Sequence, residues 1–231
     1  MTFSLVARCA RTGQLGVGAV TAMMGVGKLA TYAQPGVGAV ASQATMNPYL
    51  GIDGLRLVSS GLGADEALRR LIREDPGRDV RQAGFVDRHG HSAAWTGDKT
   101  PGWSGHICQK DVATQGNRLV GRETLEETLR AFREHSELDL AERLLVALEA
   151  GEATGADKKG ALSGTVYVVD TEEYPLWDLR VDHADDPAKE LRRLFSESLE
   201  LLIPQVKALP TRADPLGEAT RQALAEHDAA P

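Results

Sequence analysis

The second residue of the chain carries the chemistry that the sequence suggests most directly. The chain opens with Met1 and Thr2, and threonine is small enough for an initiator methionine before it to be removed. Removal would leave Thr2 with a hydroxyl and a free α-amine, which together make a nucleophile and its base on one residue. Ser4 lies two positions further on, so in a strand it would face the same side as Thr2 and either orient that amine or serve as a plain sheet hydroxyl. Many chains begin in this way, so the value of Thr2 depends on the elements around it.

The other reactive residue types suggest no metal and no cofactor. Two cysteines, Cys9 and Cys108, form neither a disulfide framework nor a zinc motif, and we expect them to be reduced thiols in a cytoplasmic protein. The six histidines lack the spacing of a metal site, and His89 and His91 straddle a predicted solvated turn. The glycines form no phosphate-binding motif between a strand and a helix, so no nucleotide cofactor is expected.

The overall charge excludes two classes of partner. The chain has 231 residues and a formal net charge of -7, whereas binding to nucleic acid or to an anionic membrane surface needs a basic face. Hydrophobic residues make up 42%, enough for a real core, but no stretch reaches the ~20 apolar residues of a membrane helix. The apolar run from Leu15 to Gly27 is diluted by glycines and is not read as a signal peptide. We therefore expect a cytoplasmic protein.

The first half of the chain alternates hairpins with helices. Strands are predicted at Phe3 to Arg8, Leu15 to Thr21, Leu29 to Ala33, Val37 to Gln43, Val80 to Val86 and Ser92 to Thr96. Two helices are predicted between the fourth and fifth of these, one from Leu50 to Ser59 and one whose apolar stripe runs from Ala67 to Ile72 and which ends before Asp75. The small residues of the first strands indicate that something packs very close to the sheet.

The second half predicts more helix. One further strand from Ile107 to Thr114 is followed by helices at Glu123 to His135 and Leu138 to Ala150, strands at Leu162 to Asp170 and Leu176 to Val181, and a long helix from Pro187 to Val206 that Pro204 kinks or ends. This order favours an α+β fold with two mainly antiparallel sheets stacked face to face and helices on both outer faces. We predict one domain over residues 1–207 and a polar tail over 208–231 with a short helix from Leu216 to Glu226.

Several motifs in order resemble a known family. They are the opening T-F-S-L-V-A-R, G-V-G-A-V-A-S-Q-A from Gly36, N-P-Y-L-G from Asn47, the helix start A-D-E-A-L after Gly63, W-S-G-H from Trp103, Q-G-N-x-L from Gln115 and D-L-R-V-D from Asp178. Over roughly residues 2 to 203 the chain resembles the uncharacterised bacterial and archaeal family DUF1028, a domain of unknown function.

The resemblance implies a fold like that of the N-terminal-nucleophile (Ntn) hydrolases, a four-layer αββα sandwich. These enzymes cut amide bonds with an N-terminal Thr, Ser or Cys, so Thr2 becomes the implied nucleophile. The family supplies no substrate, and a fold does not fix a function.

The same comparison suggests partners for Thr2. Lys28, placed at the opening of the third strand, resembles the lysine that tunes the nucleophile in proteasome-like Ntn enzymes; the alternative is a solvated lysine. The aspartate that accompanies this lysine in those enzymes, at the end of the second strand, is missing from this sequence. Thr21 lies at about that position. Backbone amides of Gln43, Ala44 and Thr45 are candidates for the oxyanion hole.

The Q-G-N-x-L motif offers a second oxyanion hole. Gly116 and Asn117 resemble the Gly-Asn pair of the glutamine amidotransferases, although Asn117 is equally consistent with a turn or cap residue before a helix. Trp103 and His106 are candidates to line the substrate pocket. Asp157 and Arg180 lie beside strands and either close one end of the site or form ordinary surface ion pairs.

Three functions remain open from the sequence. The first is a cofactor-free Ntn-type amidohydrolase acting on a small amide, N-acyl or ureido compound. The second is a non-catalytic protein of the same fold that binds a small metabolite or a protein partner. The third is an oligomeric interaction module, since a homodimer is plausible if the apolar stripe of the last long helix is exposed.

Overall fold

Two antiparallel sheets form the centre of the protein, which a computed structural model describes over residues 1–156 and 160–229. The larger sheet has six strands in the order β10-β9-β2-β1-β8-β7, and the smaller has four in the order β3-β4-β5-β6. The larger sheet contains β1 (Thr2–Arg8), β2 (Leu15–Thr21), β7 (Trp103–Gln109), β8 (Val112–Leu119), β9 (Ser163–Val169) and β10 (Trp177–Val181). The smaller contains β3 (Thr31–Gln34), β4 (Gly38–Ala44), β5 (Arg81–Asp87) and β6 (Ser92–Thr96).

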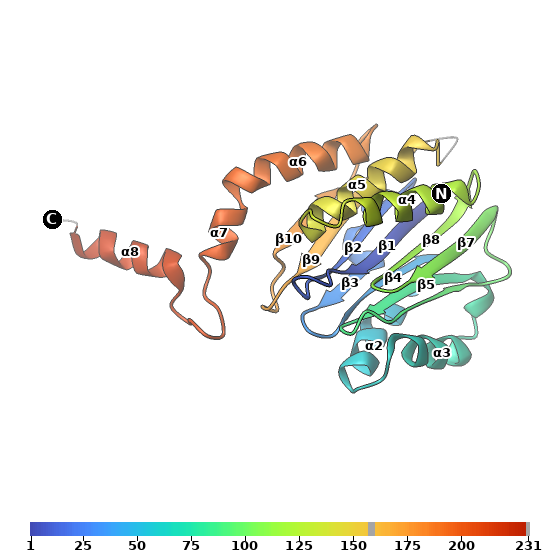
Figure 1. Cartoon of the computed structure of the whole chain (residues 1–231), viewed down its shortest axis with the longest axis horizontal. Coiled ribbons are helices and arrows are strands. Elements are labelled where there is room, and N and C mark those ends of the chain that lie inside the picture. Colours follow the sequence, from blue (N-terminus) through green and yellow to red (C-terminus); the bar gives the residue numbers. More distant parts are fainter. Residues whose placement is uncertain (157–159, 230–231) are drawn as a thin grey trace.

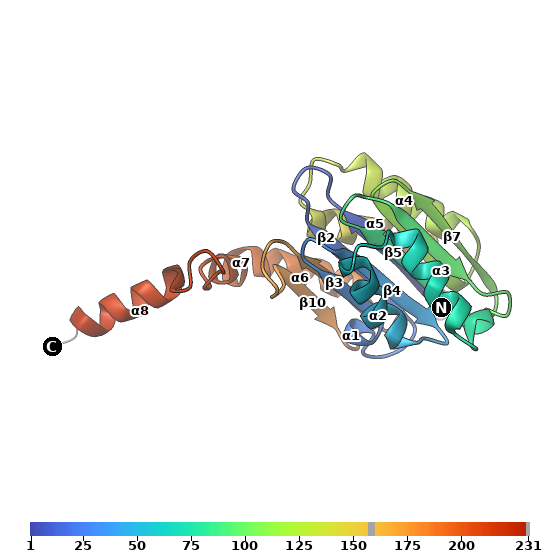
Figure 2. The ribbon, with the colours of Figure 1, turned by 90° about the horizontal axis from the view of Figure 1, so that it is seen from below.

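Helices cover both outer faces of the stacked sheets (Figure 1). The outer face of the six-stranded sheet carries α4 (Glu123–Glu134), α5 (Leu140–Ala153) and α6 (Pro187–Leu201). The outer face of the four-stranded sheet carries α2 (Pro48–Ser59) and α3 (Ala64–Glu74), and Figure 2 shows this pair from below. The predicted α+β four-layer αββα sandwich is therefore confirmed.

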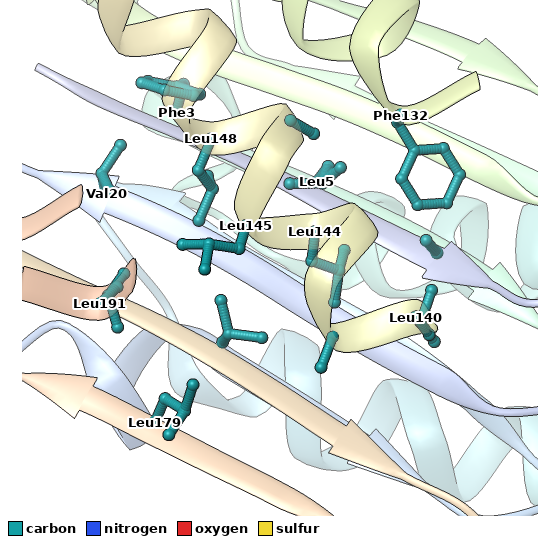
Figure 3. Close-up of a cluster of buried hydrophobic side chains, with 14 of the residues drawn as sticks. Phe3, Leu5, Val20, Phe132, Leu140, Leu144, Leu145, Leu148, Leu179 and Leu191 are labelled. Atoms are coloured by element: carbon teal, nitrogen blue, oxygen red, sulfur yellow. The ribbon is translucent and has the colours of Figure 1, made fainter. Parts of the chain in front are cut away.

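Alternation along β1 decides which side chains enter which layer. Phe3 and Leu5 point to the helices and join a core built around Leu144, Leu145 and Leu148 of α5 (Figure 3). Each large side chain removed from water there stabilises the fold by about 1.5–3 kcal/mol. The intervening residues of β1 point to the other sheet, so Thr2 starts the inter-sheet face.

Close packing of α5 on β2 explains one group of glycines. A Cβ atom on Gly16 would lie 2.9 Å from Cδ1 of Leu144, and one on Gly18 would lie 3.2 Å from Cδ1 of Leu148. The sequence predicted that another element packs very close to these strands. This prediction is confirmed, and the element is α5.

The layer between the sheets has two chemically different halves. One half is apolar and consists of Val6, Leu15, Val17, Ala39, Ala41, Val86, Ala113, Tyr167 and Val169. The other half, towards the N-terminus of β1, is polar and consists of Ser4, Gln43, Gln82 and Gln115, all buried. Burying polar groups between two sheets costs stability unless the groups form hydrogen bonds with one another. Because this polar half lies next to Thr2, its hydrogen bonds bear on the candidate functional site.

Two predicted elements differ from the structure, and one element was not predicted. The segment predicted as a strand from Leu29 begins as a helical turn, α1 (Gly27–Ala30). Thr31, the first residue of β3, donates from its backbone N–H and its Oγ1 to the carbonyl of Gly27 and so closes this turn. Lys28 therefore does not open a strand. The single strand predicted at 107–114 is the β7–β8 hairpin, turned at Asp111 with φ 68°. Gly116 and Asn117 consequently lie inside β8 and not in a turn before a helix. A 3₁₀ turn, η1 (Arg78–Val80), was not predicted.

The C-terminal segment leaves the sandwich. The long helix ends at Leu201, and the short α7 (Ile203–Lys207) carries Pro204 near its start, which agrees with the predicted break. Beyond it, α8 (Gly217–Ala229) projects away from the sheets in both views (Figures 1 and 2). None of the helices in the described ranges has the length and apolar character needed to cross a bilayer.

Candidate functional site

Thr2 begins a central strand and has a hydroxyl-bearing or amide-bearing neighbour on each side. It pairs with Thr21 at the end of β2 and with Asn117 near the end of β8. Both neighbours are almost completely buried, with 1% and 3% of their surface exposed. The register of three adjacent strands thus gathers these residues at one edge of the sheet.

This edge forms a small pocket. Its volume is about 170 Å³. The lining consists of Met1, Thr2, Thr21, Ala22, Met23, Ala44, Thr45, Pro101, Asn117 and Arg118. Such a volume is below the usual range for drug-sized ligands and suits a small molecule.

An amide carbonyl is held inside this site by three donors. The carbonyl oxygen of Met1 accepts hydrogen bonds from Oγ1 of Thr2 at 2.9 Å, from Oγ1 of Thr21 at 3.0 Å and from the backbone N–H of Ala22 at 3.1 Å. The two threonine hydroxyls are also 2.8 Å apart. Donors that converge on one carbonyl oxygen are the arrangement that stabilises negative charge on it during acyl transfer.

Two residues of the pocket have an uncommon backbone conformation. Ala44 and Arg118 have φ values of 67° and 54°, and in the described ranges the only other non-glycine residue with positive φ is Asp111. Such conformations cost about 1–3 kcal/mol each and concentrate at functional sites. The two strained residues lie on β8, the neighbour of β1 in the same sheet, and on β4, in the facing sheet.

A buried network of side-chain amides lies directly behind the pocket. Ser4 donates to Oε1 of Gln43 at 2.7 Å and accepts from Nε2 of Gln115 at 2.6 Å. Oε1 of Gln82 accepts from Nε2 of Gln43 at 2.7 Å and from Nδ2 of Asn117 at 3.0 Å. The donors and acceptors alternate in one consistent direction, so the network fixes the amide orientation of Asn117 at the pocket wall.

Gln82 is the centre of this network. Its Nε2 also donates to the carbonyls of Gly116 at 2.8 Å and Gly105 at 3.1 Å, and to Oγ1 of Thr96 at 3.0 Å. Gln82 therefore joins the two sheets and ties β8 in place beside Thr2. One acceptor, Oε1 of Gln115, is buried without a hydrogen-bond partner, a cost of about 1–3 kcal/mol that the fold tolerates at this position.

The structure brings some of the predicted residues together. Thr2, Thr45 and Asn117 line the pocket, while Ser4, Gln43 and Gly116 lie behind it in or against the amide network. The backbone N–H of Thr45 donates to the carbonyl of Val80 at 3.2 Å, so this donor is already engaged within the fold.

Lys28 lies elsewhere. Its Nζ stands over the ring of Tyr167, 2.9 Å from the centroid. Burial lowers the pKa of the Lys28 ammonium, Asp178 opposes that shift and Arg180 adds to it. Lys28 does not line the Thr2 pocket, and the ring it contacts belongs to the apolar half of the inter-sheet layer.

The remaining predicted residues that the structure describes do not line the Thr2 pocket either. Trp103 and His106 lie on β7, the edge strand of the larger sheet, where Nδ1 of His106 is 2.9 Å from Oγ1 of Thr96. Arg180 lies on the opposite edge strand, β10, and its side chain packs against Gly27. Asp157 falls outside the described residues.

Sequence reasoning missed several members of the pocket, of which Thr21, Ala22 and Arg118 bear on its chemistry. Thr21 stood out only as the residue in place of an aspartate, whereas it donates to the Met1 carbonyl with Ala22. Arg118 supplies the charge in the lining, and the Q-G-N-x-L motif that contains it was the available signal. No signal in a single sequence shows that Ala22 donates through its backbone.

Comparison with known proteins agrees with the predicted family. Residues 2–191 match the family described as "Family of unknown function (DUF1028)". No curated protein matches the sequence. The crystal structure of protein SPO2555 from Silicibacter pomeroyi, assigned to the same family, has a TM-score of 0.85 and 28% sequence identity, covering 94% of this chain and 98% of that chain. The match is long enough to extend past the end of the family match into the C-terminal segment.

More distant structures are similar over most of the chain. Anbu (ancestral beta-subunit) from Yersinia bercovieri has a TM-score of 0.42 and 14% identity, covering 90% of this chain and 98% of that chain. A Gly-1 mutant of Anbu from Hyphomicrobium sp. strain MC1 has a TM-score of 0.43 and 16% identity, covering 91% and 100%. Similarity of this degree is too weak to transfer a function.

Proposed function

Since the chain belongs to the DUF1028 family, whose function is unknown, we propose from its own pocket that it is a cofactor-independent amidohydrolase of the N-terminal-nucleophile type. Thr2 is the nucleophile once Met1 has been removed. The substrate class is a small amide, N-acyl or ureido compound.

The observation that carries the proposal is the Met1 carbonyl. An amide oxygen already occupies the point where the hydroxyls of Thr2 and Thr21 and the N–H of Ala22 converge. Removal of Met1 frees these donors and exposes the α-amine of Thr2. A substrate amide placed there meets Thr2 as the nucleophile, and two donors, the hydroxyl of Thr21 and the N–H of Ala22, remain for its carbonyl oxygen.

The reaction proceeds in two balanced halves. Oγ1 of Thr2 passes its proton to the neutral α-amine and bonds to the substrate carbonyl carbon, and the C–N bond then breaks as the leaving nitrogen takes that proton. Water next attacks the resulting ester, again with the amine as base. The acid product leaves and the Thr2 hydroxyl is restored.

The wall of the pocket narrows the substrate class. Asn117, held by Gln82, presents an amide side chain at the strand next to Thr2. Arg118 is the charged residue of the lining. An arginine at the mouth of a small pocket favours substrates that carry a carboxylate, such as N-acyl or ureido acids.

Intact mass and turnover test the proposal together. The purified protein is expected to lack Met1 and to hydrolyse at least one member of a panel of small N-acyl, amide and ureido acids. Thr2→Ala is expected to abolish this turnover, and Thr2→Ser to retain part of it. Thr171→Ala, in an exposed loop, is the matched control.

A second variant separates loss of chemistry from loss of folding. Inserting a lysine between Met1 and Thr2 prevents removal of the methionine and is expected to eliminate turnover while the thermal unfolding transition is kept. Turnover that survives either Thr2→Ala or this insertion would remove Thr2 as the nucleophile.

One observation favours a second function, a non-catalytic protein that binds a small metabolite. The lysine that tunes the nucleophile in proteasome-like relatives has its counterpart, Lys28, over Tyr167 and away from Thr2. Retention of Met1 in the purified protein, together with binding of panel compounds without turnover, would support this alternative.

A further inference from the structure

A second pocket lies at the other end of β1. It has a volume of about 290 Å³. Its lining consists of Arg8, Cys9, Ala10, Arg11, Lys110, Asp111, Val112, Phe132, Arg133, Ser136 and Arg143. β1 runs from Thr2 to Arg8, and at about 3.3 Å per residue the two pockets are about 20 Å apart.

The charge of this lining contrasts with that of the whole protein. Five of its residues are cationic (Arg8, Arg11, Lys110, Arg133, Arg143) and one, Asp111, is anionic, so the lining carries a net charge of +4. Asp139, 3.6 Å from Arg11, and Glu137, whose charge acts on Arg143 from beyond ion-pair distance, reduce the local excess to +2. The chain as a whole carries -7, so this excess is concentrated in one place.

Arg143 is buried there without a carboxylate partner. Only 8% of its surface is exposed, and its guanidinium lies over the ring of Phe132, 4.0 Å from the centroid. Its Nε and Nη2 both donate to the same carbonyl oxygen of Phe132, at 3.3 and 3.0 Å. In the described ranges no carboxylate lies within ion-pair distance of it. Burial lowers the pKa of the Arg143 guanidinium, and the groups that oppose this shift are Cys9, through its charge and a side-chain hydrogen bond, and the charge of Glu137. A buried cation without a paired carboxylate is costly.

Arg8 also has an unused donor. Its Nη1 pairs with Oδ1 of Asp111 at 3.0 Å, but its Nε is buried with no hydrogen-bond partner. An arginine presents several donors in a fixed fork that matches the oxygens of a phosphate. Arg8 thus brings an unused donor, and Arg143 a buried cation without a carboxylate at ion-pair distance, to one cavity in the described part of the chain.

The pKa of the Cys9 thiol is consistent with this positive local charge. Burial opposes its ionisation, but hydrogen bonds from the side chain and backbone of Thr12 and the backbone of Arg11, with Arg143 nearby, lower its pKa overall. A buried thiol whose ionised form is favoured indicates an environment that stabilises negative charge.

We propose that this cavity is a ligand site separate from the Thr2 pocket and that it binds a small phosphate monoester. A local excess of two or more positive charges is neutralised by a dianion and not by a simple carboxylate. The cavity is larger than inorganic phosphate alone needs, so it has room for the organic part of the ester. The proposal is independent of any hydrolase activity at Thr2.

Calorimetric titration of the full chain tests the site, with glycerol 3-phosphate and inorganic phosphate as probes and with acetate at the same ionic strength for comparison. Saturable binding of one phosphate compound per chain is expected, with acetate much weaker. Lys110 and Arg133 are both exposed, so their substitution spares the core. The double variant Lys110→Gln/Arg133→Gln is expected to bind at least about tenfold more weakly, because two charged contacts to the ligand are lost.

Two charge-matched variants locate the binding. Arg69→Gln, on the exposed face of α3, controls for net charge, and Arg118→Gln removes the cation of the Thr2 pocket. Both are expected to bind like the wild type, and thermal unfolding confirms that each variant is folded. The proposal is overturned if neither phosphate compound binds saturably, if the double variant binds as tightly as Arg69→Gln, or if Arg118→Gln alone abolishes binding.

Discussion

Oγ1 of Thr21 lies 2.8 Å from Oγ1 of Thr2 and 3.0 Å from the carbonyl oxygen of Met1. This pairing follows from the register of β1 and β2, which places the two threonines directly opposite each other. A hydroxyl in this position can stabilise both the nucleophile and the carbonyl that it attacks. Thr21 therefore contributes a neutral hydroxyl directly beside that of Thr2.

Thr21→Val is predicted to separate catalysis from folding. Valine keeps the shape of Thr21 and removes its hydroxyl, so unfolding is expected to become easier by only about 1 kcal/mol. The value of kcat is expected to fall by about 100-fold, because one donor to the developing oxyanion is lost. Kinetics on the panel substrate, with intact mass to verify removal of Met1, measure this. Thr21→Ser should recover most of the rate, and wild-type turnover in Thr21→Val would contradict the role.

Gln82→Met is predicted to destabilise the fold strongly. The substitution conserves volume but leaves the amide donors of Gln43 and Asn117 without their shared acceptor. At about 1–3 kcal/mol for each of these two buried groups left unpaired, the free energy of unfolding should fall by about 2–6 kcal/mol. Urea unfolding measures it, with Gln222→Met on the exposed face of α8 as the control. Equal stability of the two variants would show that the network contributes little.

Gly84→Ala is predicted to disrupt the same layer by overpacking. A Cβ atom on Gly84 would lie 1.9 Å from Oε1 of Gln115, and that amide is held by Ser4. The loss of stability is expected to be about 1–3 kcal/mol. Gly121→Ala serves as the control, because a Cβ atom added there would have no atom within 4 Å beyond its chain neighbours.

A double-mutant cycle tests the cause of this effect. Gln115→Ala removes the amide with which the new Cβ atom of Gly84→Ala would clash. The double variant should therefore lose about 0.5–3 kcal/mol less free energy of unfolding than the sum of the two single losses. If the losses of the two single variants simply add, the clash with Gln115 is not the cause of the destabilisation by Gly84→Ala.

Acid sensitivity is predicted to depend on Asp87, which is 2% exposed. It accepts hydrogen bonds from the backbone N–H groups of Ala64, His89 and His91, and Nδ1 of His91 lies 3.0 Å from its Oδ2. Burial would raise its pKa, but these hydrogen bonds outweigh burial and lower it. The carboxylate therefore stabilises the folded state above its unfolded pKa of about 3.9, and that stability is lost as the pH falls through the lower folded pKa.

Asp87→Asn tests the linkage. The variant is expected to lose about 1–3 kcal/mol at pH 7, because a charged acceptor becomes a neutral one, and to show a smaller further loss between about pH 5 and the acid range than the wild type. Urea unfolding at a series of pH values measures both. Parallel curves for the two proteins would assign the acid sensitivity to other carboxylates.

The layers of the fold could be predicted from the sequence because periodicity reports burial. Phe3 and Leu5 alternate with Ser4, and the stripe Leu144 to Leu148 repeats at helical spacing, so strand and helix faces are visible in the pattern. The prediction for the segment around Lys28 was wrong because four residues are too few to distinguish a helical turn from a strand start. The β7–β8 hairpin was missed because polar β8 residues such as Gln115 and Asn117 resemble a loop although they are buried.

The pocket was only partly predictable for a related reason. Thr2 and Asn117 meet through strand register, and register depends on long-range pairing that a single sequence does not contain. The donation by Ala22 is a backbone property without any side-chain signal. Lys28 was assigned to the site by analogy of chain position, and the helical turn α1 directs it to Tyr167 instead.

Lys28→Met is predicted to leave turnover close to that of the wild type. From Ser163, the partner of Thr21 on β9, the strand rises about 13 Å before it reaches Tyr167, over which Lys28 lies. This is longer than the Debye length of about 8 Å at physiological ionic strength, so the ammonium charge has little effect at Thr2. Stability should change by less than about 1 kcal/mol, because Lys28 is exposed and a cation–π contact at an exposed site is worth about 0.5–1 kcal/mol. Steady-state kinetics beside Lys207→Met, a substitution far from both pockets, provide the measurement. A loss of about 100-fold in kcat with unchanged stability is the size expected of a group acting on proton transfer, and it would return Lys28 to the catalytic site.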